Sequence, residues 1–154
     1  MTFQRAWLVK SEPESYGIDA LKADKKTPWE GVRNFQARNY MRDDMKMDDP
    51  ILFYHSSCAE PGIYGLGKVA SNPYPDQSQF NDQSPYYDPK ATKQAPIWFL
   101  VDVGFKKKLK KPILLSELRA NPKLRTLETL KQGSRLSITS VTPEEYKEIE
   151  RLAL

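Results

Sequence analysis

The sequence predicts an α+β fold, a small, mixed and partly closed β-barrel flanked by short helices. Five short runs of β-type residues recur along the chain, each bounded by turn residues and each as long as a typical strand. Helical patterns are fewer and do not alternate regularly with these runs, which argues against a doubly wound parallel sheet. With 154 residues, of which 39% are hydrophobic and 29% charged, we expect one domain over residues 1–154.

The expected strands are short apolar runs interrupted by turn-forming residues. The first stops before Pro13, because proline interrupts a sheet ladder. The fourth begins with an unbroken apolar run that contains Trp98, which we expect in the core. In chain order the strands span residues 6–10, 51–55, 63–70, 97–105 and 135–141.

The helices are expected where the apolar spacing or the capping residues favour them. The last has the clearest start. Thr142 can cap it, Pro143 suits its first turn, and Glu145 stands three residues after the cap, so that the free N–H groups of the first turn are bonded. The expected helical segments are residues 18–22, 33–45, 115–130 in two pieces separated at Pro122, and 143–152.

Glycines at positions 62, 65 and 67 interrupt the third expected strand. They do not follow the G-x-G-x-x-G order, and no helix pattern comes after them, so a dinucleotide site is disfavoured. Glycine in a strand marks a bulge or a close approach of another backbone or a ligand. Closure of the barrel is slightly favoured over contact with a planar ligand.

Residues 71–96 form a long connection with five of the twelve prolines and the rings of Tyr74, Phe80, Tyr86 and Tyr87. A structureless loop of this length is unusual in a compact domain and is often functional. We therefore expect it to fold across the barrel as a lid.

Positive charge is concentrated in one part of the chain. Residues 106–135 hold ten basic residues and two acidic ones, whereas the whole chain carries a net charge of +4. Such a patch attracts polyanions, although a solvated turn or a protected edge strand would also explain it. As contacts to a nucleic-acid backbone we expect Lys106, Lys107, Lys108, Lys110 and Lys111.

Composition disfavours several classes of protein. No apolar run approaches the ~20 residues that span a bilayer, and the run after Arg5 is too short for a signal sequence, so we expect a soluble, cytoplasmic protein without membrane contact. One cysteine, Cys58, and one histidine, His55, exclude an internal disulfide and leave too few ligands for an ordinary zinc site. No acidic cluster indicates Mg²⁺, and we expect neither a metal nor a cofactor.

Two segments indicate a ligand pocket. In residues 29–39, Arg33 and Arg38 stand in the expected first turns of a helix, where they oppose the helix dipole unless an anion is bound. Trp29 lies outside any apolar run and is a candidate for stacking. In the second segment, Lys10, Ser11 and Glu12 end the first strand, and their polar groups could read the edge of a base.

His55 stands beside Ser56, Ser57 and Cys58, a grouping that suggests a nucleophile and a base. Adjacent residues of a strand point to opposite faces, so His55 and Ser56 cannot form such a pair while the strand continues. Neither a G-x-S-x-G motif nor a second histidine is present. A structural or ligand-binding role for His55 is therefore favoured over hydrolysis.

Seven ordered motifs run through essentially the whole chain: WLVKSEP (7–13), WEGVRNFQARN (29–39), FYHS (53–56), PGIYG (61–65), YYDPK (86–90), WFLVDV (98–103) and RLSI (135–138). Together they resemble the EVE domain family, which includes the thymocyte nuclear proteins of eukaryotes. The resemblance implies a PUA-like barrel, related to the YTH domains that hold a methylated adenine in an aromatic cage. It also implies a reader of modified bases in DNA or RNA, altered cytosines included.

By this resemblance Trp29 would form a wall of the base pocket. Ser11 and Asn34 would bond the base, and the arginines would meet phosphate or a polar base substituent. The remaining residues would complete the pocket and its rim. The full set of expected base-binding residues is Lys10, Ser11, Glu12, Trp29, Val32, Arg33, Asn34, Arg38, His55, Ser56 and Tyr87.

The leading hypothesis is a monomeric, non-catalytic module that takes one modified base of a nucleic acid, flipped out or single-stranded, into this pocket. One alternative is an enzyme acting on a modified nucleotide or base, with Glu12, His55 or Asp102 as acid or base. The other is a pocket for a small anionic metabolite. The sequence leaves open the modification, the choice between DNA and RNA, and the pathway.

Overall fold

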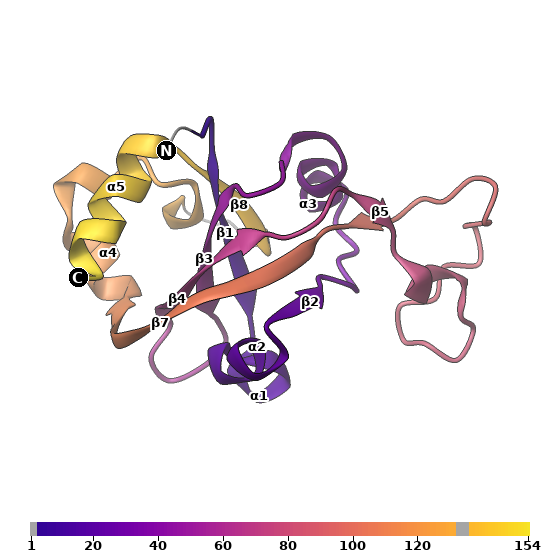
Figure 1. Cartoon of the computed structure of the whole chain (residues 1–154), viewed down its shortest axis with the longest axis horizontal. Coiled ribbons are helices and arrows are strands. Elements are labelled where there is room, and N and C mark those ends of the chain that lie inside the picture. The colour runs from indigo at the N-terminus through magenta and orange to yellow at the C-terminus, as the bar shows by residue number, and fades with distance from the viewer. Residues whose placement is uncertain (1–2, 132–135) are drawn as a thin grey trace.

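The structure is a computed structural model that describes residues 3–131 and 136–154. These residues form a curled six-stranded sheet in the order β2-β7-β4-β3-β1-β8, with a separate two-stranded ladder of β5 and β6 (Figure 1). The strands are β1 (Ala6–Ser11), β2 (Lys26–Pro28), β3 (Pro50–His55), β4 (Gly62–Val69), β5 (Tyr74–Pro75), β6 (Phe99–Leu100), β7 (Asp102–Leu114) and β8 (Ile138–Val141).

Short helices surround the sheet, and none of those in the described residues exceeds the ten residues of α5. α3 continues directly into a π-helical turn, Tyr40–Asp44, and three 3₁₀ turns lie at Gln77–Phe80, Pro122–Leu124 and Glu128–Leu130. The α-helices are α1 (Pro13–Tyr16), α2 (Ile18–Asp24), α3 (Phe35–Asn39), α4 (Leu115–Ala120) and α5 (Pro143–Leu152). Within the described part of the chain, no helix is long and apolar enough to cross a membrane.

The sheet mixes parallel and antiparallel pairs. β1 lies parallel to β3 and antiparallel to β8, and the other neighbours are antiparallel. Register shifts occur where β4 meets its two neighbours, and such bulges increase the local twist and bend of a sheet. β2 and β8 remain the outer strands of the sheet in the described residues. The predicted α+β fold with a partly closed barrel is confirmed.

Both faces of the central strands are buried. Successive side chains of a strand point to opposite faces, and in β1 the alternation places Leu8 in one core cluster and Trp7 and Val9 in the other. The first cluster includes residues of α4 and α5, and the second includes residues of α2 and α3. Figure 1 accordingly shows α4 with α5 at one end of the sheet, and α2 and α3 on other sides of it.

The long connection does not form a lid across the sheet. Its first part pairs as β5 with β6 and continues into a 3₁₀ turn. The rest extends away from the sheet, as Figure 1 shows to the right of β5. This part of the prediction is wrong, because the segment is tied to the end of the sheet by β5 and β6 instead of being packed over its face.

Other element boundaries also differ from the prediction. β2 was missed, because its three residues contain no apolar run. The expected strand 97–105 divides into β6 and the thirteen-residue β7, which carries the lysines of 106–111. These lysines therefore lie on a strand and not in a turn. Residue 135, the expected start of the last strand, lies outside the described residues, and β8 begins at Ile138.

The glycines of β4 lie against the neighbouring strand. A side chain at Gly62 would collide with the backbone of Ile113 and Leu114, and one at Gly67 with the backbone of Gly104. The favoured interpretation, that these glycines let the barrel close, agrees with these contacts.

We expect Gly62→Ala to destabilise the fold by about 1–3 kcal/mol, because the backbone of β7 has to move to admit the methyl group. Gly104→Ala on the facing strand is the matched control, since its Cβ would lie 3.3 Å from a side-chain atom of Ala70 and the loss should be smaller. Urea denaturation followed by circular dichroism measures both. Equal losses for the two variants would contradict the packing argument.

Candidate functional site

A hollow of about 610 Å³ opens at the carboxyl end of β1. Residues of α1, of β2 and of the segment that follows β2 also line it. Its size is within the range of small-molecule and cofactor sites. We call it the base hollow, after the base-binding residues that the sequence predicts in this part of the chain. The residues that line it are Lys10, Ser11, Glu12, Ser15, Tyr16, Thr27, Pro28, Trp29, Glu30, Gly31, Val32, Arg33, Tyr86 and Ser137.

Polar groups at the end of β1 provide one side of the base hollow. The hydroxyl of Ser11 donates a hydrogen bond to the carbonyl of Tyr16 at 2.6 Å, so its oxygen is left as an acceptor for a ligand. The ammonium group of Lys10 lies 5.8 Å from the ring centre of Tyr54, and burial lowers the pKa of Lys10. Glu12 is exposed and adds an acidic side chain to this side.

Aromatic rings provide a second part of the lining. Trp29 is held by edge-to-face contacts with Phe53, at 5.8 Å between ring centres, and with Tyr16, at 6.4 Å. Its backbone N–H donates to the carbonyl of Val101 at 3.0 Å. Burial, followed by the hydrogen bond to Asp24, raises the pKa of Tyr16 to about 12, so the phenol stays neutral. The tryptophan ring therefore has a defined position before any ligand arrives.

Arg33 is bound within the protein. Its guanidinium group lies 3.2 Å from a carboxylate oxygen of Asp76 and also donates to the hydroxyl of Ser78 and the carbonyl of Tyr86. The N–H of Gly31 donates to the same carboxylate at 2.9 Å. The sequence indicated an anion near the start of this helix, and Asp76 of the chain itself provides one. Arg33 thus organises the wall of the base hollow.

Tyr86 reaches the base hollow from the long connection. Gly31 has φ +85°, and a Cβ there would overlap the ring of Tyr86, so glycine is needed for both reasons. The predicted rim residue was the next one, Tyr87, which is 43% exposed and does not line the base hollow. Because an irregular loop has no side-chain period, the sequence could not distinguish the two tyrosines.

Asn34 and Arg38 lie outside the lining. The side-chain oxygen of Asn34 accepts a hydrogen bond from the N–H of Ala37 and thereby caps α3. Arg38 donates to the carbonyl of Ile97 and to the side chain of Asn39, each at 2.8 Å. Both residues have structural contacts, and their binding roles remain predictions.

His55 and Ser56 do not line the base hollow. The Nε2 atom of His55 accepts a hydrogen bond from the N–H of Ile18 at 3.1 Å, and the imidazole stacks on Tyr64 with ring centres 4.0 Å apart. The backbone N–H of Ser56 donates to the carbonyl of Ser11. His55 therefore supports the start of α2, and its nitrogen Nε2 is already used.

Six of the eleven predicted base-binding residues thus come together in the base hollow: Lys10, Ser11, Glu12, Trp29, Val32 and Arg33. The prediction missed residues from the short helix α1, the unrecognised strand β2 and the distant loop. Proximity to Pro13 and Trp29 was a signal for some of them. Tyr86 and Ser137 stand in two of the family motifs, YYDPK and RLSI, but no local pattern placed them beside the end of β1.

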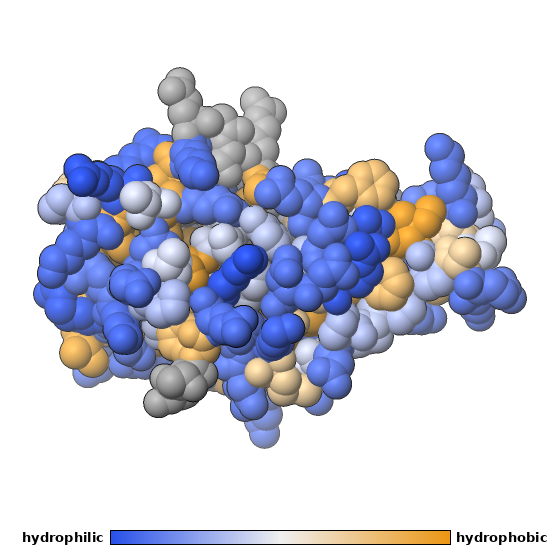
Figure 2. All heavy atoms as spheres, turned by 90° about the horizontal axis from the view of Figure 1, so that it is seen from above, coloured by the Kyte–Doolittle hydropathy of each residue, from blue (hydrophilic) through white to orange (hydrophobic). Residues whose placement is uncertain are grey.

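The lysines of residues 106–111 follow β7 beyond the end of β2, which pairs with residues 102–104. Their side chains are exposed, and Lys108 is 2.7 Å from a carboxylate oxygen of Asp19 in α2. Figure 2 shows one face of the molecule on which hydrophilic residues predominate and apolar residues form small separate patches.

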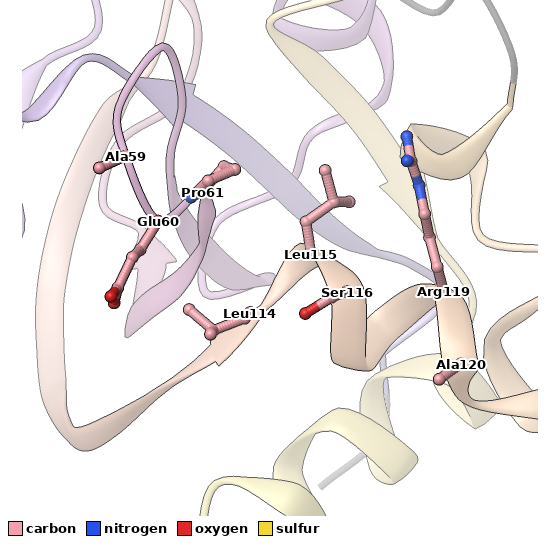
Figure 3. Close-up of a pocket in the computed structure, with 8 residues that line it drawn as sticks. All are labelled: Ala59, Glu60, Pro61, Leu114, Leu115, Ser116, Arg119 and Ala120. Carbon is pink, nitrogen blue, oxygen red and sulfur yellow. The ribbon is translucent and has the colours of Figure 1, made fainter.

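A second hollow of about 680 Å³ lies between the loop before β4 and the start of α4 (Figure 3). Pro61, Leu114 and Leu115 line its middle, while the charged ends of Glu60 and Arg119 lie far apart. Unlike the base hollow, it lacks polar groups that converge on one point. In residues 3–131 and 136–154, no group of three or more metal-binding side chains occurs.

The sequence profile of the EVE domain matches residues 5–152. The chain belongs to the EVE domain family. It is 42% identical to thymocyte nuclear protein 1 of Mus musculus, over 91% of this chain and 70% of the relative. An uncharacterized protein of Schizosaccharomyces pombe is 39% identical, over 97% of this chain and 69% of its own length.

Solved structures agree with this membership. A hypothetical protein from Leishmania major is 41% identical and has a TM-score of 0.92, with 98% of this chain and 95% of that chain covered. Human thymocyte nuclear protein 1 was solved in complex with DNA that contains 5-methylcytosine. It is 40% identical and has a TM-score of 0.89, with 97% of each chain covered.

Asp76→Asn should destabilise the domain by about 1–3 kcal/mol at neutral pH, because Arg33 and the N–H of Gly31 lose a charged acceptor. Burial alone would raise the pKa of Asp76, but hydrogen bonds from Ser78, Gly31 and Arg33 outweigh it and hold the pKa below its ordinary value of 3.8. The advantage of the wild type is therefore complete above pH 3.8 and declines as the pH falls below it.

Urea midpoints of wild type and Asp76→Asn, measured at pH 7 and again below pH 3.8, provide the check. A difference between the two proteins that stays constant over this range would exclude the charged carboxylate as its cause.

Wild-type stability should also fall as the pH is lowered from 7 to 5. Burial lowers the pKa of His55 below 6.5, with Asp19 opposing the shift and Lys108 adding to it. The unfolded chain then binds a proton that the folded chain excludes. In His55→Gln, a neutral replacement that can still accept a bond from Ile18, melting temperatures should change less over this range. Parallel pH curves would show that His55 is not the responsible group.

Proposed function

We propose that this domain binds DNA and takes one modified cytosine, 5-methylcytosine in the first instance, into the base hollow without catalysing a reaction. The observation that carries the proposal is the complex of human thymocyte nuclear protein 1 with DNA containing 5-methylcytosine. That relative matches 97% of this chain at 40% identity. This complex of a relative supports DNA over RNA as the nucleic-acid partner in the proposal.

The polar side of the base hollow suits cytosine. The exocyclic amine of cytosine is a donor, and carboxylates accept from it in protein–DNA complexes. Glu12 can supply such an acceptor, and the oxygen of Ser11 can only accept because its proton is used on Tyr16. The ammonium group of Lys10 donates, which matches the two acceptors on the pairing edge of the base.

The aromatic side supplies stacking and an apolar surface for the methyl group. A base stacked on an aromatic side chain contributes ~1–3 kcal/mol. Trp29 and Tyr86 both line the base hollow, and Val32 adds an aliphatic side chain to the lining. In this proposal Arg33 holds Tyr86 in place, while Asn34 and Tyr87 lie outside the cavity that takes the base.

The exposed lysines of β7 provide the backbone contacts in this proposal. Lys106, Lys107, Lys110 and Lys111 are exposed on β7. This strand lies next to the outer strand β2 in the sheet. Their contribution is independent of sequence and declines with salt, since it depends on the release of counterions from DNA.

The enzyme alternative has less support in the geometry. Of its three proposed acids and bases, Glu12 lines the base hollow. His55 accepts the N–H of Ile18, and Asp102 accepts the hydroxyl of Tyr74 at 2.5 Å. General acid–base catalysis on a base in the hollow would need such groups within hydrogen-bond reach of the reacting atoms.

Trp29→Ala and Tyr86→Ala should lose most of their preference for 5-methylcytosine over cytosine, because each removes a wall of the base hollow. Tyr87→Ala is the matched control, a neighbouring tyrosine of similar exposure that does not line it. Fluorescence anisotropy titrations with paired methylated and unmethylated oligonucleotides measure the ratio of the two dissociation constants.

A wild-type protein with the same affinity for both oligonucleotides would overturn the proposal. The same titrations with RNA and with free 5-methylcytidine distinguish the alternatives. Stronger binding to RNA would favour an RNA reader, and full affinity for the free nucleoside would favour a metabolite pocket.

A further inference from the structure

Phe35 is the most exposed aromatic residue in the described part of the chain. Its exposed fraction is 58%, compared with 42% for Tyr86 and 43% for Tyr87. It is also the first residue of α3, two positions after Arg33. Neither the predicted site nor the base hollow includes it. A large apolar ring on the surface next to a ligand site suggests a contact that the base hollow does not explain.

The ring of Phe35 is held in one position. It stacks on Trp98 with ring centres 4.8 Å apart and planes inclined by 21°. Trp98 is 5% exposed, and its indole N–H donates to Asp88 at 2.8 Å. One face of Phe35 therefore rests on a fixed ring. Binding by the other face requires little loss of side-chain freedom.

Arg38 makes cation–π contacts with both rings of this stack. The carbon of its guanidinium group is 4.8 Å from the ring centre of Phe35 and 5.8 Å from that of Trp98. A cation above the outer face of Phe35 would lie farther from Trp98 than this, so Arg38 lies on the side of Phe35 that faces Trp98 and leaves the outer face open. The nearby carboxylate of Asp43 is bound on both oxygens by Arg42. Positive charge thus lies 4.8 Å from the centre of a ring whose outer face is open.

The stack is connected to the base hollow through Arg33. The carbon of its guanidinium group lies 5.1 Å from the ring centre of Trp98 and 5.6 Å from that of Tyr86. Tyr86 lines the base hollow, whereas Trp98 supports Phe35. The two aromatic surfaces therefore belong to one continuous group of rings and guanidinium groups.

We propose that Phe35 is a second stacking position, which takes the nucleobase next to the one held in the base hollow, and that Arg38 contacts the phosphate between them. This inference rests on the proposed function. A flat ring with a cation close to it matches a flat base that carries an anionic link. Stacking of this kind accepts any base, because every base has a π-face.

The two stacking positions should therefore differ in what they contribute. Loss of the Phe35 ring removes affinity from methylated and unmethylated DNA alike. The loss should be roughly 5- to 150-fold, the equivalent of about 1–3 kcal/mol for one stacked base. The ratio of the two dissociation constants should stay as in the wild type, whereas Trp29→Ala changes that ratio.

The test uses single-stranded oligonucleotides with one 5-methylcytosine and the fluorescent base 2-aminopurine on its 5′ or its 3′ side. Wild-type protein should quench 2-aminopurine at one of the two positions, since stacking on an aromatic ring quenches it. Phe35→Ala should abolish this quenching and weaken binding, and Phe35→Trp should retain both. Met47→Ala removes another exposed apolar side chain, 47% exposed, and should match the wild type.

Three results would overturn the inference: affinity of Phe35→Ala within twofold of the wild type, a changed preference for 5-methylcytosine in that variant, or quenching that persists without the ring. In each case the wild type would still prefer methylated DNA, and the proposed function would stand. A wild-type protein that binds neither methylated nor unmethylated DNA would overturn both proposals. Circular dichroism of each variant verifies that it is folded.

Discussion

The parallel pairing of β1 with β3 is the constraint on which the rest of the structure depends. Both strands are buried on both faces, so each needs helices on two sides of the sheet. They also end together, with Ser11 opposite His55, and the chain leaves the sheet there into α1 and α2. His55 then bonds the first residue of α2, which fixes that helix beside the strand ends. The base hollow lies at this edge, because the end of β1 and the helix α1 contribute residues to its lining there.

Sequence patterns predicted the helices and strands that capping residues or apolar runs within the segment itself determine. α5 begins at Pro143 and ends at Leu152 as expected, since the hydroxyl of Thr142 and the carboxylate of Glu145 bond the free N–H groups of its start. The fold class and the central strands followed from apolar runs of sufficient length. β2 was not predictable in this way, because its three residues become a strand only by pairing with β7.

In the base hollow, too, features that depend on neighbouring residues were predictable, and features that depend on distant residues were not. Residues of the strand end and of the Trp29 segment could be proposed from their chemistry and from family motifs. The ion pair of Arg33 with Asp76 joins residues 43 positions apart, and neither position has a periodic pattern that indicates the other. The sequence shows the positive charge of Arg33 but not its acidic partner, and for this reason it predicts a bound anion. Asp76 removes that need, and the polar groups of Lys10, Ser11 and Glu12 remain beside the rings in the lining of the base hollow.

The origin of the wall that contains Tyr86 affects how such domains diversify. The wall that contains Tyr86 comes from a connection that is anchored at its ends by β5 and β6 and projects from the sheet. Substitutions in that connection alter the shape of the base hollow while the buried strands keep their contacts. Under the proposed function, such substitutions change which base modification is preferred without first compromising folding. The anchoring pair of Arg33 and Asp76 sets the limit of this freedom, since it must persist for the wall to stay in place.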